Sequence, residues 1–279
     1  MYQDGRRMTL PDKESVKAYW DNEPCGTGGI GHPEGSLEYY EAIAKNRDRL
    51  EPFIADYAQF WKWKGKKVLE VGCGTGSDLV RFAKAGAIVT GIDLSTRSAA
   101  LAKHRLRVYG RRGDIFVGDA EELPFEGGEF SMAYSWGCLH HTPHTEKAIG
   151  EMHRVLEPGG RICVMLYHKR SLVGLQMYLL FGLLRGKPFR GLDDILANHH
   201  ESPGTKAYTV GEVKQMFSAF RDVEVSIQTT IYDRRHRRDR YLPEWVGRII
   251  PRGLGWHLII RGEKPPEEMK MNEGAMDGH

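Results

Sequence analysis

The feature that most constrains this chain is an apolar strand that runs directly into a glycine-rich turn and then into a helix. Residues 67–71 form the strand pattern, Gly72, Gly74 and Gly76 follow, and a helical pattern opens at Ser77. Glycine carries no Cβ to keep a ligand away from the backbone, and a helix start offers N–H groups and a positive dipole end. The turn therefore predicts a site for a phosphate or a carboxylate, with a plain strand–helix connection as the alternative.

The alternation of strand and helix patterns continues through the middle of the chain. Short apolar runs, each bounded by Gly, Pro or acidic residues, alternate with helical patterns, which is typical of a parallel sheet covered on both faces. One helix, predicted over 143–156, has an apolar stripe and is stopped by Pro158-Gly159-Gly160. Seven strands are predicted, at 67–71, 88–92, 115–118, 130–135, 161–167, 223–231 and 255–262. The predicted fold class is α/β.

Segments on both sides of this alternating core predict additions to it. A Gly/Pro-rich stretch and an aromatic-rich helical pattern precede the core and indicate a lid, and an apolar and then polar insertion follows the fifth strand. The predicted division is a lid at 1–64, a core at 65–168, a helical cap at 169–208, the last helix and two strands at 209–262, and a disordered tail at 263–279.

The most apolar run of the chain, residues 171–184, lies in the predicted cap. It is shorter than the roughly 20 residues that span a bilayer, so it predicts a buried or capping helix. Its side chains are apolar nearly all round, so one face can pack on the core while the other needs a second cover. We expect that face to line the pocket of the molecule acted upon or a homodimer interface, with a membrane surface as the third choice.

Charge balance and cysteine usage exclude several classes of protein. The chain has 40 Lys and Arg against 37 Asp and Glu, a net charge of +3 that is too small to indicate a nucleic-acid partner. Its four cysteines show no paired metal-ligand spacing, so we expect no metal site and a reducing, cytoplasmic location. No secretory signal and no transmembrane segment are expected either.

Two aspartates stand at the ends of later strands. Asp93 lies 21 residues after Gly72, where its carboxylate can accept hydrogen bonds from both ribose hydroxyls. Asp119 follows the third strand and can accept a hydrogen bond from an adenine amino group, with a solvated acidic loop as the alternative. A dinucleotide dehydrogenase would have its third glycine at position 77, which is Ser77 here. The spacing therefore favours another nucleoside cofactor.

In this region the chain resembles the class I S-adenosylmethionine-dependent methyltransferases, especially the small-molecule and lipid group that includes the quinone-biosynthesis methylases. The resemblance covers residues 65–168 and rests on ordered motifs at 68–76, 92–95, 118–125, 139–143 (Leu-His-His-Thr-Pro) and 154–161. It implies S-adenosylmethionine as the cofactor and S-adenosylhomocysteine as its product. It also implies a Rossmann-like, seven-stranded, mostly parallel sheet in the order 3-2-1-4-5-7-6 with the last strand antiparallel.

The resemblance further implies which residues bind the cofactor. They are Glu70, Gly72, Gly74 and Gly76 around the methionine part, Asp93 at the ribose, Leu94, Asp119 and Ala120 at the adenine, Ser135 and Trp136 beside the sulfonium, and Cys73 and Ser95 within the same turns.

Aromatic and histidine residues outside these turns are further candidates. Tyr19 and Trp20 of the lid can cover a sulfonium through cation–π contact, with ordinary helix packing as the alternative. His140 and His141 follow the fourth strand, at the point where ligands bind in open α/β sheets. Either can be the catalytic base that removes a proton from a hydroxyl, phenol or acid, and a purely structural role stays open.

We therefore predict a cytoplasmic methyltransferase acting on an O, N or C atom of a small, partly apolar molecule. The Arg-rich run 234–240 can bind a carboxylate or phosphate on an anionic acceptor, with a solvated loop as the alternative. Two other functions stay open. An RNA or protein methyltransferase predicts a signature such as Asn-Pro-Pro-Tyr after the fourth strand, which this chain lacks. A non-catalytic module would have kept the fold and lost the reaction.

Overall fold

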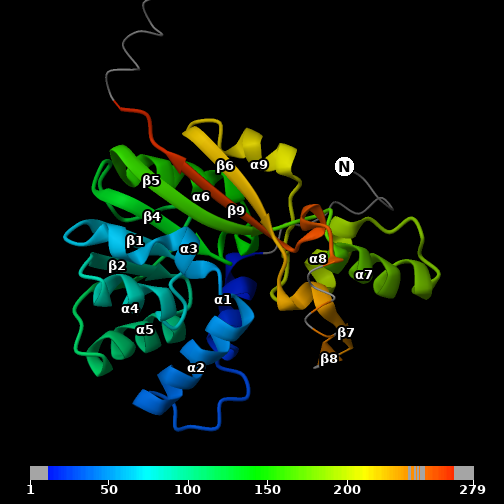
Figure 1. The fold of residues 1–279 in the computed structure, drawn as a ribbon, viewed down its shortest axis with the longest axis horizontal. Coiled ribbons are helices and arrows are strands. Elements are labelled where there is room, and N and C mark those ends of the chain that lie inside the picture. Colours follow the sequence, from blue (N-terminus) through cyan, green and yellow to red (C-terminus); the bar gives the residue numbers. More distant parts are fainter. Residues whose placement is uncertain (1–11, 238–239, 242, 244, 246–248, 267–279) are drawn as a thin grey trace, which may run out of the picture.

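The computed structural model describes residues 12–237, 240–241, 243, 245 and 249–266, and one seven-stranded sheet forms its centre (Figure 1). The sheet order is β3-β2-β1-β4-β5-β9-β6, which confirms the predicted order because β9 is the last strand of this sheet along the chain. β9 runs antiparallel to β5 and β6, and the other pairs are parallel. The strands are β1 (Lys67–Val71), β2 (Ile88–Asp93), β3 (Asp114–Val117), β4 (Phe130–Trp136), β5 (Leu156–Tyr167), β6 (Arg221–Gln228) and β9 (His257–Glu263).

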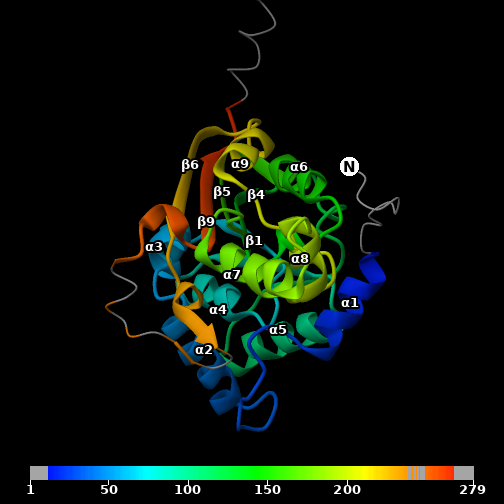
Figure 2. The ribbon, with the colours of Figure 1, turned by 90° about the vertical axis from the view of Figure 1, so that its right-hand side faces the viewer.

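Helices surround this sheet, so the α/β, Rossmann-like fold class is confirmed (Figures 1 and 2). The α-helices are α1 (Lys13–Asn22), α2 (Leu37–Leu50), α3 (Ile54–Ala58), α4 (Ser77–Lys84), α5 (Thr96–Val108), α6 (Thr145–Val155), α7 (Leu172–Phe181), α8 (Leu192–His199) and α9 (Val210–Met216). Short 3-10 helices are η1 (Phe60–Trp63), η2 (Leu139–His141), η3 (Leu183–Arg185), η4 (Ile231–Arg234) and η5 (Arg252–Leu254).

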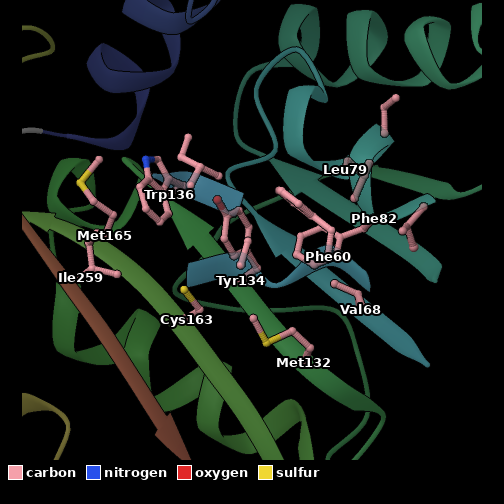
Figure 3. Close-up of a cluster of buried hydrophobic side chains, with 14 of the residues drawn as sticks. Phe60, Val68, Leu79, Phe82, Met132, Tyr134, Trp136, Cys163, Met165 and Ile259 are labelled. Atoms are coloured by element: carbon pink, nitrogen blue, oxygen red, sulfur yellow. The ribbon is translucent and has the colours of Figure 1, made fainter. Parts of the chain in front are cut away.

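Alternate residues of the central strands enter two cores, one on each face of the sheet, because successive strand side chains point to opposite faces. Val68, Met132 and Tyr134 belong to the core that includes residues of α3 and α4 (Figure 3). Leu69 and Ala133 belong to the core that includes residues of α6 and α9. Burial on both faces explains why these strands read as nearly continuous apolar runs in the sequence.

The parallel pairing brings the carboxyl ends of the central strands to one edge of the sheet. β1 pairs in register with β2, from Lys67 beside Ile88 to Val71 beside Ile92. At the end of this ladder the N–H groups of Gly72 and Cys73 both donate to the carbonyl oxygen of Ile92, at 2.8 and 3.1 Å. The glycine turn is therefore tied to the end of β2, where Asp93 lies.

The structure corrects two predicted boundaries. The helix predicted over 143–156 spans Thr145–Val155, and β5 begins at Leu156, so Pro158-Gly159-Gly160 lies within the strand rather than before it. The strand extends this far because the N–H of Gly159 donates to the carbonyl of Lys264, and the N–H of Lys264 donates to the carbonyl of Gly160. The strand predicted over 223–231 ends at Gln228, and a turn follows in which Thr230 N–H donates to Asp233 Oδ2 at 2.7 Å.

The apolar run predicted as one helix over 171–184 forms two, α7 and η3, on either side of Gly182. The Arg-rich connection between β6 and β9 contains a small hairpin, β7 (Arg235–Arg237) and β8 (Arg240–Tyr241), that the sequence did not suggest. Residues 238–239 of the Arg-rich run, and 267–279 of the predicted tail, lie outside the described residues. Within the described residues, no helix combines the length and apolar character needed to cross a membrane.

Candidate functional site

A cavity that is partly open to solvent lies at the carboxyl edge of the sheet. The walls come from the segments after β1, β2, β3 and β4 and from helices α1 and α2. Predicted site residues in the wall are Trp20, Glu70, Gly72, Cys73, Gly74, Asp93, Leu94, Asp119, Ala120, Trp136 and His141.

The structure gives a different reason for glycine at each of the three positions of the turn. All three have positive φ, at 74°, 51° and 75° for Gly72, Gly74 and Gly76. A Cβ on Gly72 would lie 2.3 Å from the Cβ and Sγ atoms of Cys138, and one on Gly76 would lie 3.1 Å from Ala102. A Cβ on Gly74 would meet only Cys25, at 3.9 Å. Gly74 thus leaves backbone open to the cavity, whereas Gly76 serves helix packing and does not line the cavity.

The carboxylate of Asp93 is held in place by two backbone N–H groups. Gly74 N–H donates to Oδ2 at 2.8 Å, and Ser95 N–H donates to Oδ1 at 2.9 Å. Burial raises the pKa of Asp93 to about 6, against the lowering effect of the hydrogen bonds from Ser95 and Gly74. Each oxygen keeps a further lone pair, so the carboxylate can accept hydrogen bonds from two neighbouring hydroxyls of a ligand.

Glu70, at the end of β1, has a buried side chain whose Oε2 makes no hydrogen bond to any described residue. Burial raises its pKa well above the ordinary value, and the nearby carboxylate of Asp78 adds to this shift. A buried polar atom without a partner is costly. Because Glu70 lines the cavity, a positively charged group of a ligand would remove that cost.

Arg47, on α2, also lines the cavity and was not predicted from the sequence. Its Nη2 donates to Asp78 Oδ2 at 2.6 Å, and its Nη1 lies 3.3 Å from Glu51 Oε2. Tyr134 O–H donates to the same Asp78 oxygen at 2.9 Å. This network fixes the guanidinium at the cavity wall, where it can also meet an anionic group of a ligand.

Asp119 lies at the edge of the cavity and is paired with a lysine that was not predicted. Lys13, on α1, forms ion pairs with Asp119 and, at 2.8 Å, with Glu121 Oε2. The other oxygen of Asp119 accepts from Glu121 N–H at 2.8 Å. The N-terminal helix is thus fastened to the loop after β3, next to Ala120 in the wall.

Another part of the cavity wall is aromatic. Trp20 of α1 packs edge-on against His141 of η2, with ring centroids 5.2 Å apart, and Tyr19 packs edge-on against Trp20 without lining the cavity. Trp136, at the end of β4, donates its Nε1–H to Glu51 Oε1 at 3.0 Å. Cys25 adds a thiol to this wall. The N-terminal segment therefore supplies one side of this part of the cavity, which we term the acceptor end.

His141 is oriented at the acceptor end by residues from a distant loop. Its Nδ1 lies 2.8 Å from Ser202 Oγ and 3.1 Å from Thr205 Oγ1. Its Nε2 lies 3.3 Å from Glu201 Oε2 and makes no hydrogen bond to a described residue. Tyr167 O–H donates to the same Glu201 oxygen at 2.8 Å. The imidazole thus has Nδ1 held by hydroxyls and Nε2 next to a carboxylate.

Glu201 is the residue at this end that sequence reasoning missed altogether. It has φ 50°, a conformation that costs free energy for a residue other than glycine and that is frequent at functional sites. Desolvation alone would raise its pKa, but the adjacent imidazole of His141 and the charge of His200 lower the pKa to about 2. Glu201 is therefore a carboxylate at neutral pH.

His140 does not line the cavity and is fully buried beside Tyr167, with ring centroids 3.9 Å apart. Burial lowers its pKa well below the ordinary value, and neither ring nitrogen has a hydrogen-bond partner among the described residues. His140, His141 and Glu201 offer ligand atoms within 4.8 Å of one another and are the described residues that could hold a metal ion together.

Two further predicted site residues lie outside the cavity wall. Ser95 begins α5 as its N-cap, accepting from Ser98 N–H at 3.0 Å, and its Oγ donates to Asp21 at 2.7 Å. Ser135 is buried within β4. No residue of α7 or η3 lines the cavity, so the apolar run of the predicted cap does not contribute to this wall.

Comparisons with known proteins agree with this geometry. Residues 68–160 match a family model described as a methyltransferase domain. The demethylmenaquinone methyltransferase of Staphylococcus aureus (strain JH9) is 30% identical over 213 residues, which cover 68% of this chain and 86% of that protein. The norajmaline N-methyltransferase of Rauvolfia serpentina is 36% identical over 112 residues, which cover 39% of this chain and only 38% of that protein.

A solved structure shows the same fold. The geranyl diphosphate C-methyltransferase of Streptomyces coelicolor A3(2), solved with Mg²⁺, geranyl diphosphate and S-adenosylhomocysteine, superposes with a TM-score of 0.58. The superposition covers 93% of this chain and all of that chain, at 16% identity.

Proposed function

Because this chain belongs to the class I S-adenosylmethionine-dependent methyltransferases and uses S-adenosylmethionine as its cofactor, we propose that it methylates a small, largely apolar molecule bearing an ionisable hydroxyl group. The methylated atom is that oxygen or a carbon that the ionised oxygen activates. The observation that carries this proposal is the Nε2 atom of His141, without a hydrogen-bond partner among the described residues and next to the Glu201 carboxylate.

The residues around the cavity fit the cofactor. Glu70 Oε2, buried and without a partner among the described residues, suits the positively charged amino group of the methionine part. Arg47 suits its carboxylate. Asp93 has lone pairs for the ribose hydroxyls, and the backbone at Gly74 is open to close approach. We assign the adenine to the wall formed by Leu94, Asp119 and Ala120.

When bound, S-adenosylmethionine supplies a methyl group on a positively charged sulfur, which an acceptor atom in line with the carbon–sulfur bond can take in one displacement. Trp20 and Trp136 line the cavity at the acceptor end and can exclude water there. Their ring faces also favour a nearby positive charge through cation–π attraction. Positioning of this kind can supply roughly 7–11 kcal/mol of barrier reduction without a covalent enzyme intermediate.

We assign the proton of the acceptor hydroxyl to Nε2 of His141. Ser202 and Thr205 hold Nδ1, which leaves Nε2 without a hydrogen bond to a described residue and able to take a proton. The Glu201 carboxylate, 3.3 Å from Nε2, stabilises the positive charge that the imidazole gains with the proton. His140 then acts as a positioning residue packed behind His141, at a ring-centroid distance of 4.3 Å.

The apolar character of the acceptor is supported by the cavity wall. Val16, Trp20, Trp136 and Pro143 line the cavity together with the polar His141. The relatives named for demethylmenaquinone and norajmaline support a small lipid-like or polycyclic acceptor. The four cysteines are free thiols, which supports a reducing compartment such as the cytoplasm.

Calorimetry and a transfer assay test this proposal. The protein should bind S-adenosylhomocysteine and not NAD, and should move radiolabelled methyl from S-adenosylmethionine onto short-chain hydroquinones or polycyclic phenols. The matched O-methylated compounds, which lack the ionisable proton, should not react. Transfer to tRNA or to a protein fraction, with no transfer to any phenol, would overturn the acceptor class. Absence of binding to S-adenosylhomocysteine would overturn the cofactor site itself.

A further inference from the structure

An exposed apolar surface on the predicted cap is not used by the proposed reaction. It consists of side chains of α7, η3 and the segment after them, and we call it the cap patch: Leu175, Leu179, Leu180, Leu183, Leu184 and Phe189. Leu184 is 75% exposed and Phe189 90% exposed, which is unusual for such large apolar side chains. Contiguous apolar surfaces of this kind mark sites of interaction.

The side chains of the cap patch are close together along the chain. Leu175 and Leu179 are four residues apart in α7 and share a helix face, and Leu183 and Leu184 follow in η3, after Gly182. Val173, also of α7, is buried in the core. α7 and α8 lie at the front of Figure 2, at the end of the molecule that Figure 1 draws on the right.

Positive charges flank the cap patch. Arg170 precedes α7, and Arg185 and Lys187 follow it, all three exposed. None of these three forms an ion pair with another described residue, whereas Lys169 and Arg190 pair with aspartates of α8. The charges that flank the apolar side chains are therefore available to an outside partner.

The basic character extends to the neighbouring segment. η4 packs against α7 and leads into the Arg-rich connection. Together residues 169–200 and 233–252 contain twelve Lys and Arg against five Asp and Glu, although the whole chain carries only +3. Positive charge is thus concentrated in these two stretches of the sequence.

We propose that the cap patch binds the surface of a membrane rich in anionic lipids. The leucines and Phe189 would enter the boundary between headgroups and acyl chains, and Arg170, Arg185 and Lys187 would face the phosphates. A second copy of this chain fits less well, because it would bring two positively charged rims together. The inference stands apart from the identity of the acceptor.

Vesicle co-sedimentation tests the inference. The full chain is mixed with vesicles of phosphatidylglycerol and phosphatidylcholine, or of phosphatidylcholine alone, and the bound fraction is measured at low and high salt. We expect binding to the anionic vesicles, weakened by salt, and little binding to the neutral ones. Absence of binding to both vesicle types, or equal binding to both, would overturn the proposal.

Two pairs of variants locate the binding surface. Leu180→Glu/Leu184→Glu should lower the partition coefficient at least about 100-fold, because each leucine contributes roughly tenfold or more. Leu37→Glu, at a 41% exposed leucine that begins α2, should leave it unchanged. Arg185→Gln/Lys187→Gln should lower it about fivefold per charge, and Arg111→Gln/Arg112→Gln, at two exposed arginines elsewhere, should not.

Two controls keep the outcome decisive. Each variant should bind S-adenosylhomocysteine with the affinity of the unchanged protein, which shows that it is folded and separates this test from that of the proposed function. Size-exclusion chromatography tests whether a second copy of the chain covers the cap patch instead of a membrane. If the unchanged protein is a dimer, Leu180→Glu/Leu184→Glu makes it a monomer, and neither form binds anionic vesicles, a second copy covers the cap patch and the membrane proposal is wrong.

Discussion

The two ends of the cavity are built in different ways. At the cofactor end, Asp93 is held by backbone N–H groups of the adjoining turns. Gly72 is in close contact with Cys138, in the segment after β4. At the acceptor end, His141 is oriented by Ser202 and Thr205, which lie 61 and 64 residues further along the chain. The cofactor end therefore depends on the sheet itself, whereas the acceptor end depends on how added segments meet.

This difference has a consequence for mutations. Changes at the cofactor end disturb the turn that links the end of β1 to the end of β2. They should lower the free energy of unfolding or the affinity for the cofactor. Changes at the acceptor end alter side chains on loops, which tolerate replacement, and should affect the reaction alone.

The largest effect is expected from a change in the glycine turn. Gly72→Ala adds a Cβ 2.3 Å from Cys138 at a φ of 74°, so we expect the free energy of unfolding to fall by about 3 to 5 kcal/mol. Gly110→Ala is the matched control, because its φ is 61° and nothing lies within 4 Å, and it should cost only about 1 to 2 kcal/mol. Urea unfolding measures both. Equal losses would show that close packing at Gly72 is unimportant.

The sequence predicts which residues meet at the cofactor end, because its signals are local. The end of β1, the glycines and Asp93 form one strand–turn–helix–strand unit, so the residue types and their spacing are enough. Gly76 and Ser95, also predicted to bind the ligand, lie outside the cavity wall, where Gly76 packs against α5 and Ser95 caps that helix, and their contact with the ligand stays a prediction. Such structural roles also favour glycine at positive φ and serine at an N-cap, so the residue type alone does not separate the two uses.

The acceptor end was predicted only in part because its residues meet through tertiary structure. His141 was found from its place after a strand, but Glu201 carries no local signal. Lys13 and Arg47, which were missed at the cofactor end, carry none either. Glu201 lies in a loop with positive φ, and sequence patterns do not reveal which loop folds over which strand end. Likewise, β5 begins early because of hydrogen bonds to Lys264, more than 100 residues later in the chain.

The second prediction concerns the acceptor end. His141→Gln should lower kcat about 100-fold or more with a phenolic acceptor, because general base catalysis contributes 10²–10⁴-fold. The dissociation constant of S-adenosylhomocysteine should change less than about twofold. Glu201→Gln keeps the shape but removes the charge beside Nε2, so it should lower kcat by a smaller factor, about tenfold. If both variants lose cofactor affinity in proportion to activity, the two ends are not independent.

The third prediction compares two aspartates at the cofactor end. Asp93→Asn should weaken S-adenosylhomocysteine binding about 10- to 100-fold, because a charge-assisted hydrogen bond contributes about 1.5–3 kcal/mol. The new NH₂ group would also face a backbone N–H donor. Asp119→Asn should cost only a few-fold, since its carboxylate is already engaged by Lys13 and Glu121. Calorimetry measures both, and a larger effect at Asp119 would reverse the assignment of ribose and adenine.

The smallest expected effect concerns a proton at Glu70. Burial raises the pKa of this carboxyl well above its ordinary value, so the free protein holds this proton to a higher pH than an exposed carboxyl does. A positively charged amino group next to it favours the ionised form, and ligand binding should therefore release a proton. Affinity must then rise with pH, by at most about tenfold per pH unit for one proton. Calorimetry in buffers of different ionisation enthalpy should show this release for the unchanged protein and for Asp119→Asn.

Glu70→Gln should bind a few-fold more weakly and release no proton. Release that persists in Glu70→Gln would assign the proton to Asp93 instead. Burial raises the pKa of the Asp93 carboxyl to about 6, so this group can also lose a proton near neutral pH. In that case the amino group of the ligand would be bound elsewhere, and the buried Oε2 of Glu70 would need another explanation.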